Sequence, residues 1–257
     1  MKILTITDIH AKPNSYYGLM EVLEREKPDL LLVAGDITNF GPSSFASEFF
    51  GYISSYFSGH GSEKYSPGDS GSGAELGGRV IAVRGNCDTP DVKAVLEEMN
   101  IDGELRLNEV KTCGNSEQRE QIVVLGIGGS PETPFGTPYE YDEEMLRPEL
   151  EVLFKKAAAR CKEKGSDLIV LSHAPAQGIN DEVRGAPRGS SMLKQMCELY
   201  PPAVFVSGHI HEARGVVREG STLYINPGPF KEGYYGIIEK SVAKYKGGAY
   251  QALLRAI

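Results

Sequence analysis

Five apolar runs in this chain each end beside side chains that can bind a metal ion, and this pattern restricts the folds open to the chain. The runs at 2–7, 30–34, 79–84, 168–171 and 203–206 have the length and composition of buried strands. The polar residues that follow them are Asp8, His10, Asp36, Asn86, His173, His209 and His211. Of the chain's five histidines, only His60 lies outside this set.

Helical patterns separate these runs, which predicts a mixed α/β fold. Amphipathic spacing indicates helices near 14–26, 43–57, 142–163 and 191–199. Strands and helices alternate first, as in a parallel sheet built from β-α-β units, and short strands near 215–218 and 222–225 predict a second, mixed sheet. Because ligands collect at the carboxyl ends of strands in open α/β sheets, we expect the seven polar residues to converge.

The chemistry of these residues favours a transition metal. Imidazole, carboxylate and amide ligands together suit Mn, Fe, Zn or Co better than an ion that prefers oxygen alone. Seven ligands exceed one tetrahedral site, and they fit two sites that share a bridging carboxylate. Each motif is weak alone, since an isolated Asp8 is more often a turn residue or a helix cap, and a single histidine such as His173 is more often a hydrogen-bonded, half-buried residue. Their occurrence in order, each closing an apolar run, favours a shared site.

The ordered motifs resemble the calcineurin-like metallophosphoesterase superfamily over about residues 1–230, and in particular its small bacterial and archaeal phosphodiesterase-like branch. The motifs are Asp8-x-His10, Gly35-Asp36, Gly85-Asn86-x-Asp88, His173 and Gly208-His209-x-His211. The resemblance implies an α/β (α+β mixed) fold, a four-layer αββα sandwich with two central mixed β-sheets flanked by helices. It also implies two divalent metal ions, for which we expect Mn²⁺, with Fe, Zn, Ni or Co as alternatives.

The resemblance also implies the ligand sets and the reaction. One metal would be held by Asp8, His10, Asp36 and His211, and the other by Asp36, Asn86, His173 and His209, with Asp36 bridging. A hydroxide shared by the two ions would attack the phosphorus of a phosphate ester, most readily a phosphodiester. We assign catalytic roles to Asn86, Asp88 and His209. The alternatives are a non-catalytic scaffold or adaptor with the same fold, and a phosphomonoesterase or phosphoprotein phosphatase.

Cys87 departs from the broad family pattern, in which many members carry a histidine that protonates the leaving group. We interpret Cys87 as a small residue near the site, whose side chain diverges from that of Asn86 if the backbone is extended there. A metal ligand, a redox thiol and a proton donor are the alternatives. The expected consequence is a preference for substrates with good leaving groups, because losing a general acid typically costs 10²–10⁴-fold in rate.

Candidate substrate contacts are Asn39, Arg184 and Arg188. The alternatives are that Asn39 is a turn residue and that the two arginines are solvated surface residues. The Asn226-Pro227-Gly228 turn is expected to support the site from behind. The expected substrate is a small phosphate ester or a nucleotide.

Composition and charge restrict which other partners and locations we expect. The net charge of −8 and the lack of a basic stripe argue against stable nucleic-acid binding. No stretch approaches the roughly 20 apolar residues of a membrane span, and the N-terminus lacks a secretory pattern, so we expect a cytoplasmic protein. The four scattered cysteines form no C-x-x-C pair. We expect one domain over residues 1–257, with a flexible Gly- and Ser-rich insertion at 58–78; the oligomeric state is not predicted.

Overall fold

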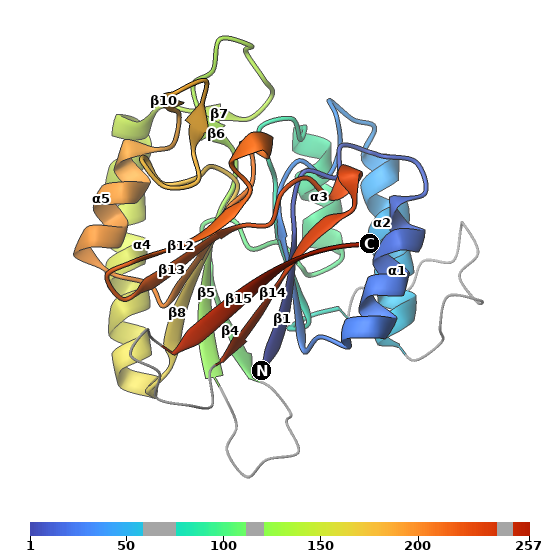
Figure 1. Cartoon of the computed structure of the whole chain (residues 1–257), viewed down its shortest axis with the longest axis horizontal. Helices are drawn as coiled ribbons and strands as arrows, with labels where there is room; N and C mark the ends of the chain where they lie inside the picture. Colours follow the sequence, from blue (N-terminus) through green and yellow to red (C-terminus); the bar gives the residue numbers. More distant parts are fainter. Residues whose placement is uncertain (59–75, 112–120, 241–248) are drawn as a thin grey trace.

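The computed structural model describes residues 1–58, 76–111, 121–240 and 249–257, and two β-sheets form its centre (Figure 1). The first sheet has the order β15-β14-β1-β2-β3. Its strands are β1 (Lys2–Ile6), β2 (Leu30–Ala34), β3 (Val80–Val83), β14 (Tyr234–Lys240) and β15 (Tyr250–Ala256). The second sheet has the order β12-β13-β11-β8-β5-β4. Its strands are β4 (Leu107–Lys111), β5 (Gln121–Ile127), β8 (Asp167–Ser172), β11 (Val204–Val206), β12 (Gly215–Glu219) and β13 (Thr222–Asn226).

Helices cover the outer face of each sheet, as Figure 1 shows. The first sheet packs against α1 (Ser15–Glu26), α2 (Ser43–Phe57) and α3 (Pro90–Glu98). The second sheet packs against α4 (Glu143–Lys164) and α5 (Ser191–Leu199). A third apolar cluster fills the space between the two sheets. The mixed α/β class with two central mixed sheets and flanking helices is therefore confirmed.

The sequence of β2 is apolar at each position and does not alternate between apolar and polar residues. Successive side chains of a strand point to opposite faces of the sheet. Leu31 and Val33 face the helices, whereas Leu30, Leu32 and Ala34 face the second sheet. Both faces are covered, so each position of the strand is buried and apolar.

The two sheets do not divide the chain into an early and a late half. β14 and β15 come from the end of the chain, yet they extend the first sheet, where β14 pairs with β1 in antiparallel register. In the second sheet β5 pairs in parallel with β8, and β8 with β11. The first sheet retains the expected parallel core of β1, β2 and β3.

Two further expectations concern the Gly- and Ser-rich segment at 58–78 and membrane-spanning helices. Most of the Gly- and Ser-rich segment at 58–78 lies outside the described residues, because 59–75 are not among them. Among the helices of the described ranges, none combines the length and apolar character that crossing a bilayer requires.

Candidate metal centre

The seven predicted ligands meet at the carboxyl ends of five strands from the two sheets. Asp8 and His10 follow β1, Asp36 follows β2 and Asn86 follows β3, which are parallel neighbours in the first sheet. From the second sheet, His173 follows β8 and His209 follows β11, while His211 begins the short 3₁₀ helix η2 (His211–Ala213). Parallel neighbours within each sheet end at the same edge, and the packing of the two sheets places Asp8 next to His209 and His211, about 200 positions away.

One part of the cluster is formed by Asp8, His10 and His211. The Nε2 atoms of His10 and His211 lie 3.3 Å apart, and Nε2 of His211 lies 3.1 Å from Oδ1 of Asp8. Asp8 is fully enclosed, whereas the His211 side chain is 30% exposed. This part of the cluster therefore faces solvent. Asp36 joins it to the deeper part, since its Oδ2 lies 3.6 Å from Nε2 of His10.

The deeper part contains Asp36, Asn86, His173 and His209. Oδ1 of Asp36 lies 3.5 Å from Nε2 of His173, and Oδ1 of Asn86 lies 2.9 Å from the same nitrogen. The rings of His173 and His209 meet edge to face with centroids 5.0 Å apart. Asp36 thus contacts histidines of both parts, which is the position that a bridging carboxylate requires.

Four of these residues have the left-handed backbone conformation that side chains other than glycine rarely adopt. The φ angles are 54° for Asp8, 49° for His10, 49° for Asp36 and 66° for His209. Such residues cost of order 1–3 kcal/mol each and persist only where the surrounding structure fixes them, commonly at functional sites. Their concentration in one cluster is typical of a functional site.

Glycines precede the ligands because the chain segments approach closely there. A Cβ atom on Gly85 would lie 2.1 Å from Oδ1 of Asp36, and one on Gly208 would lie 1.9 Å from Oγ1 of Thr7. Both distances are too short for any side chain. The hydroxyl of Thr7 in turn donates to Oδ2 of Asp8 (2.8 Å), and sequence reasoning missed this contact.

Metal binding needs ionised carboxylates and neutral imidazoles. The pKa values of Asp8, His173 and His209 are shifted in that direction, whereas those of Asp36 and His211 are shifted in the opposite direction. Burial alone would raise the pKa of Asp8, but hydrogen bonding to His10 and His211 outweighs it and holds that pKa well below its usual range. Burial and the nearby Asp8 charge raise the pKa of Asp36. Burial lowers the pKa of His173, and burial also lowers the pKa of His209, to about 4. The pKa of His211 is raised, chiefly by its hydrogen bond with Asp8.

The contacts of His173 show that a cation fits this cluster. Its Nδ1 lies 2.8 Å from the carbonyl oxygen of Ala34, which only an N–H can satisfy. A neutral ring has one N–H for two oxygens, so when this N–H donates to Ala34 the lone pair at Nε2 faces the lone pairs of Asn86 Oδ1 at 2.9 Å. Two acceptors at this distance repel each other unless a positive charge lies near both. The ligand atoms of Asp8, Asp36 and His173 lie within 4.8 Å of one another, as do those of Asp8, His10 and His211.

Asp88 lies behind the cluster and links two of its loops. Its carboxylate accepts hydrogen bonds from the backbone N–H groups of Ile37 (3.0 Å), Thr38 (2.7 Å) and Gly85 (2.8 Å), and from the Thr38 hydroxyl (2.8 Å). The residue is fully buried. Burial and the charge of Asp36 raise its pKa to about 6. Asp88 therefore fixes the loop that carries Asp36 against the loop that carries Asn86.

Cys87 does not diverge from Asn86 as an extended backbone would require. The segment forms a turn, in which the backbone N–H of Asp88 donates to the carbonyl of Gly85 (3.2 Å). The Asn86 amide donates to the Cys87 sulfur at 3.7 Å, and this sulfur lies within 4.8 Å of ligand atoms of His10 and Asp36. Burial and the charge of Asp36 raise the pKa of the thiol, which keeps it protonated in the metal-free protein.

The three predicted substrate contacts lie on exposed segments. Asn39 is exposed after Asp36, and its segment is joined to Cys87 by the N–H of Phe40 (3.0 Å). Arg184 and Arg188 are exposed on the hairpin of β9 (Glu182–Val183) and β10 (Ala186–Pro187), which lies against η2. Their role in substrate binding stays a prediction.

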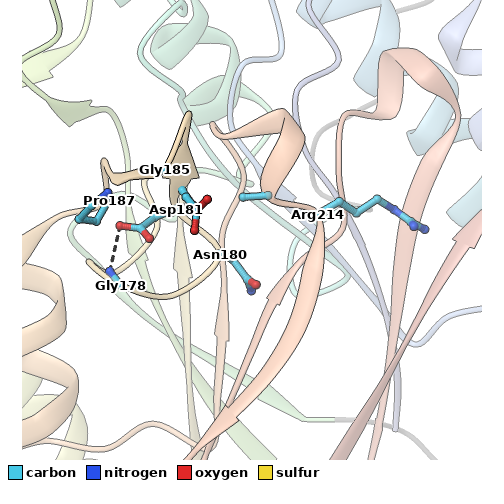
Figure 2. A pocket seen from close by; sticks show the side chains of 8 residues that line it. Gly178, Asn180, Asp181, Gly185, Pro187 and Arg214 are labelled. Atoms are coloured by element: carbon cyan, nitrogen blue, oxygen red, sulfur yellow. Dashed lines mark hydrogen bonds between the residues drawn. The ribbon is translucent and has the colours of Figure 1, made fainter.

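A pocket of about 510 Å³ opens beneath this hairpin (Figure 2). Its lining residues are Gly178, Asn180, Asp181, Glu182, Gly185, Pro187, Ala213 and Arg214. Figure 2 shows the Asp181 carboxylate turned towards Gly178, whose N–H donates to it at 2.9 Å, while the side chain of Arg214 points away from the pocket. The carboxylate of Asp181 therefore stabilises the loop that precedes the hairpin.

The turn at Asn226 holds the segment between the two histidines of the last motif. Nδ2 of Asn226 donates to the carbonyl of Ile210 (2.8 Å), and its Oδ1 accepts from the N–H of Gly228 (2.9 Å).

A second supporting segment, Thr137 to Glu140, contacts Asn86 and was not expected from the sequence. Its loop has neither periodicity nor a ligand motif, so no sequence signal marked it.

A family model for calcineurin-like phosphoesterases matches residues 1–213. The chain belongs to the calcineurin-like phosphoesterase family. This family comprises metal-dependent hydrolases of phosphate esters, and the cluster supplies candidate metal-ligand groups for that chemistry. An uncharacterised protein of Methanocaldococcus jannaschii is 30% identical over 236 residues, which cover 89% of this chain and 88% of that protein.

Solved structures share the calcineurin-like fold at low identity. The protein TT1561 of Thermus thermophilus has a TM-score of 0.58 and 16% identity, with 92% of each chain covered. A dimetal phosphatase of Danio rerio has a TM-score of 0.53 and 12% identity, with 100% of this chain and 98% of that chain covered. At these identities the similarity describes the fold alone.

Proposed function

We propose that this calcineurin-like phosphoesterase is a phosphodiesterase with a dinuclear metal centre. One site would be held by Asp8, His10, Asp36 and His211, and the other by Asp36, Asn86, His173 and His209, with Mn²⁺ as the preferred ion. The observation that carries the proposal is the position of Asp36. Its two oxygens lie 3.6 Å and 3.5 Å from histidines of the outer and deeper parts of the cluster.

Two divalent ions, when bound, lower the pKa of a coordinated water and offset the charge of a phosphoryl group. The protein's own residues keep this centre rigid. Asp88 fixes the loops of Asp36 and Asn86, and Thr7 orients Asp8. Neutral His173 and His209 keep their lone pairs available, because burial holds their pKa values low. No reorganisation of these groups is then needed when substrate binds.

The surroundings of Cys87 support a diester with a good leaving group. The raised pKa of its thiol in the metal-free protein makes it a weak acid near neutrality. Nearby cations would favour the thiolate instead, which has no proton to donate. In neither state is Cys87 an effective acid for a poor leaving group. We therefore expect activated esters to be hydrolysed faster than alkyl esters.

The test is hydrolysis of bis(4-nitrophenyl) phosphate by the metal-stripped full chain after Mn²⁺ is returned. Wild type is expected to recover activity, and Asp36→Ala is expected to remain inactive, because it loses the carboxylate shared by both sites. 4-Nitrophenyl phosphate, a monoester with the same leaving group, is expected to react more slowly. Equal activity of wild type and Asp36→Ala would contradict the proposal. Mn²⁺ binding without any hydrolysis would favour a scaffold instead.

A further inference from the structure

The loop between the short strands β6 (Ser130–Pro131) and β7 (Glu140–Tyr141) holds Asn86 at two points. Nδ2 of Asn86 donates to Oγ1 of Thr137 at 3.1 Å. The backbone N–H of Tyr139 donates to the carbonyl oxygen of Asn86, also at 3.1 Å. The loop therefore contacts both the side-chain amide and the backbone of a proposed metal ligand.

Glu140 determines which way the Thr137 hydroxyl points. Oε1 of Glu140 lies 2.6 Å from Oγ1 of Thr137. An ionised carboxylate has no proton to donate, so the hydroxyl proton of Thr137 goes to Glu140. Oγ1 then offers only lone pairs to Asn86, and the NH₂ end of the amide must face it. The amide oxygen is thereby turned towards His173.

Glu140 stays ionised over the whole useful pH range. Burial opposes its ionisation, but hydrogen bonds from the hydroxyls and backbone N–H groups of Thr133 and Thr137 outweigh this and lower its pKa to about 2. The carboxylate is therefore a constant acceptor. The direction of the Thr137 hydroxyl does not change near neutral pH.

Without this constraint the amide of Asn86 would favour the opposite orientation in the metal-free protein. Its oxygen now faces the lone pair at Nε2 of His173 at 2.9 Å, which is a contact between two acceptors. Turning the amide over would present its NH₂ group to that lone pair and form a hydrogen bond. The amide nitrogen, however, has no lone pair available for a cation. The orientation that satisfies the metal-free site is thus the one that cannot bind metal.

We propose that Thr137 and Glu140 are positioning residues that hold the amide oxygen of Asn86 towards the metal centre and so maintain its metal affinity. The inference rests on the proposed function, because it takes Asn86 as a ligand. The buried ion pair of Arg84 and Glu104, next to the loop, supports this inference. Arg84 donates two hydrogen bonds to Glu104 (2.8 and 3.0 Å), and its guanidinium lies 4.1 Å from the centroid of the Tyr139 ring. Tyr139 is therefore held in place beside Asn86.

The first test compares three variants of the loop threonines in the metal-stripped full chain. Thr137→Val removes the hydroxyl and keeps the shape of the side chain, whereas Thr137→Ser keeps the hydroxyl. Thr133→Val is the matched control, because the Thr133 hydroxyl donates to the same oxygen of Glu140 (2.5 Å). In the part of the chain that the structure describes, Thr133 has no hydrogen bond to Asn86.

Mn²⁺ binding measured by isothermal titration calorimetry, without substrate, gives the readout. Wild type is expected to bind two ions per chain. Thr137→Val is expected to bind one of them 10–100-fold more weakly, the range typical of groups that orient a metal ligand. Thr137→Ser and Thr133→Val are expected to bind both ions with affinities near those of wild type. Excess Mn²⁺ is expected to restore hydrolysis by Thr137→Val, because the ligands themselves remain.

Glu140→Ala gives a second, independent variant. It removes the carboxylate that accepts the hydroxyl proton of Thr137, which frees this proton to go to the oxygen of Asn86. The turned amide then becomes stable, and the same 10–100-fold loss in Mn²⁺ affinity is expected.

The outcomes separate the inference from the proposed function. Wild type that binds no Mn²⁺ would contradict the proposed function itself. Two ions bound by wild type and by Thr137→Val with equal affinity would overturn only the inference. An equal loss in Thr133→Val would overturn it as well, because the effect would then come from the loop as a whole rather than from the Asn86 amide.

Discussion

The Nε2 atoms of His10 and His211 lie 3.3 Å apart, and that of His211 also lies 3.1 Å from Oδ1 of Asp8. These three atoms face one another across the outer part of the cluster. A proton held by His211 satisfies Asp8 in the metal-free protein, which is why the pKa of His211 is raised. A metal ion at the same place needs the lone pair that this proton occupies.

Mn²⁺ affinity is therefore expected to fall as the pH is lowered through the raised pKa of His211. Binding must displace one proton from this ring, which weakens the affinity by about tenfold per pH unit once the ring is protonated. Calorimetric titrations between pH 8 and pH 5.5, in buffers of different ionisation enthalpy, measure both the affinity and the number of protons released. Binding that is independent of pH and releases no proton would contradict this view of the outer part.

Metal-free protein is expected to lose stability on acidification through His209. Its pKa is about 4 in the fold, against about 6.5 in an unfolded chain, so the unfolded state binds more protons in between. The contribution is complete above pH 6.5 and is lost as the pH falls towards 4, by roughly 3 kcal/mol in total. Urea unfolding of wild type and His209→Gln measures the difference. Asp88 titrates in this window with the opposite sign in both proteins, so only the difference between their pH profiles reports on His209. Parallel pH profiles of the two proteins would contradict the assignment.

Gly85→Ala is expected to impair metal binding by displacing Asp36. A Cβ atom there would lie 2.1 Å from Oδ1 and 2.2 Å from the backbone nitrogen of Asp36, so the loop that carries this carboxylate must shift relative to His10 and His173. We expect Mn²⁺ affinity to fall more than tenfold, in line with effects on groups that orient ligands. Gly18→Ala in α1 is the control, since a Cβ at Gly18 would meet only the tip of the flexible Ile257 side chain, at 2.8 Å. Equal Mn²⁺ affinities of the two variants would contradict the close approach.

Cys87→Ser is expected to change turnover of bis(4-nitrophenyl) phosphate only modestly. A thiol that does not protonate the leaving group contributes little to the rate, whereas loss of a general acid costs 10²–10⁴-fold. The dependence of rate on leaving-group pKa is expected to be the same in both proteins. A fall of more than about a hundredfold, with Mn²⁺ content unchanged, would show that Cys87 takes part in the chemical step.

The sequence predicted the strand ends of the site well, because each ligand directly follows an apolar run whose burial is a local signal. Asp36 after β2 and His173 after β8 are examples. These strands lie in different sheets, and the packing of the two sheets brings the two residues together. The direction of Cys87 was not predictable in this way. It depends on a turn closed by the hydrogen bond from Asp88 to Gly85 (3.2 Å), which the apolar pattern does not encode.

Long-range contacts account for the other features that were missed. Nothing in the sequence indicates that β14 pairs with β1, because both strands are continuous buried runs that would fit other neighbours in a sheet equally well. The contact of Thr137 with Asn86 joins residues 51 positions apart within an irregular loop. Neither periodicity nor a ligand motif marks such a residue, so its role emerges only from the three-dimensional structure.

The most direct test of the central claim is the position and number of metal ions bound by this cluster. Crystals of the full chain grown with Mn²⁺, with diffraction data collected at the manganese absorption edge, locate the ions by their anomalous scattering. The account predicts two peaks, with the carboxylate of Asp36 between them and with His10 and His173 on opposite sides. A single peak, or peaks that do not contact Asp36, would contradict it.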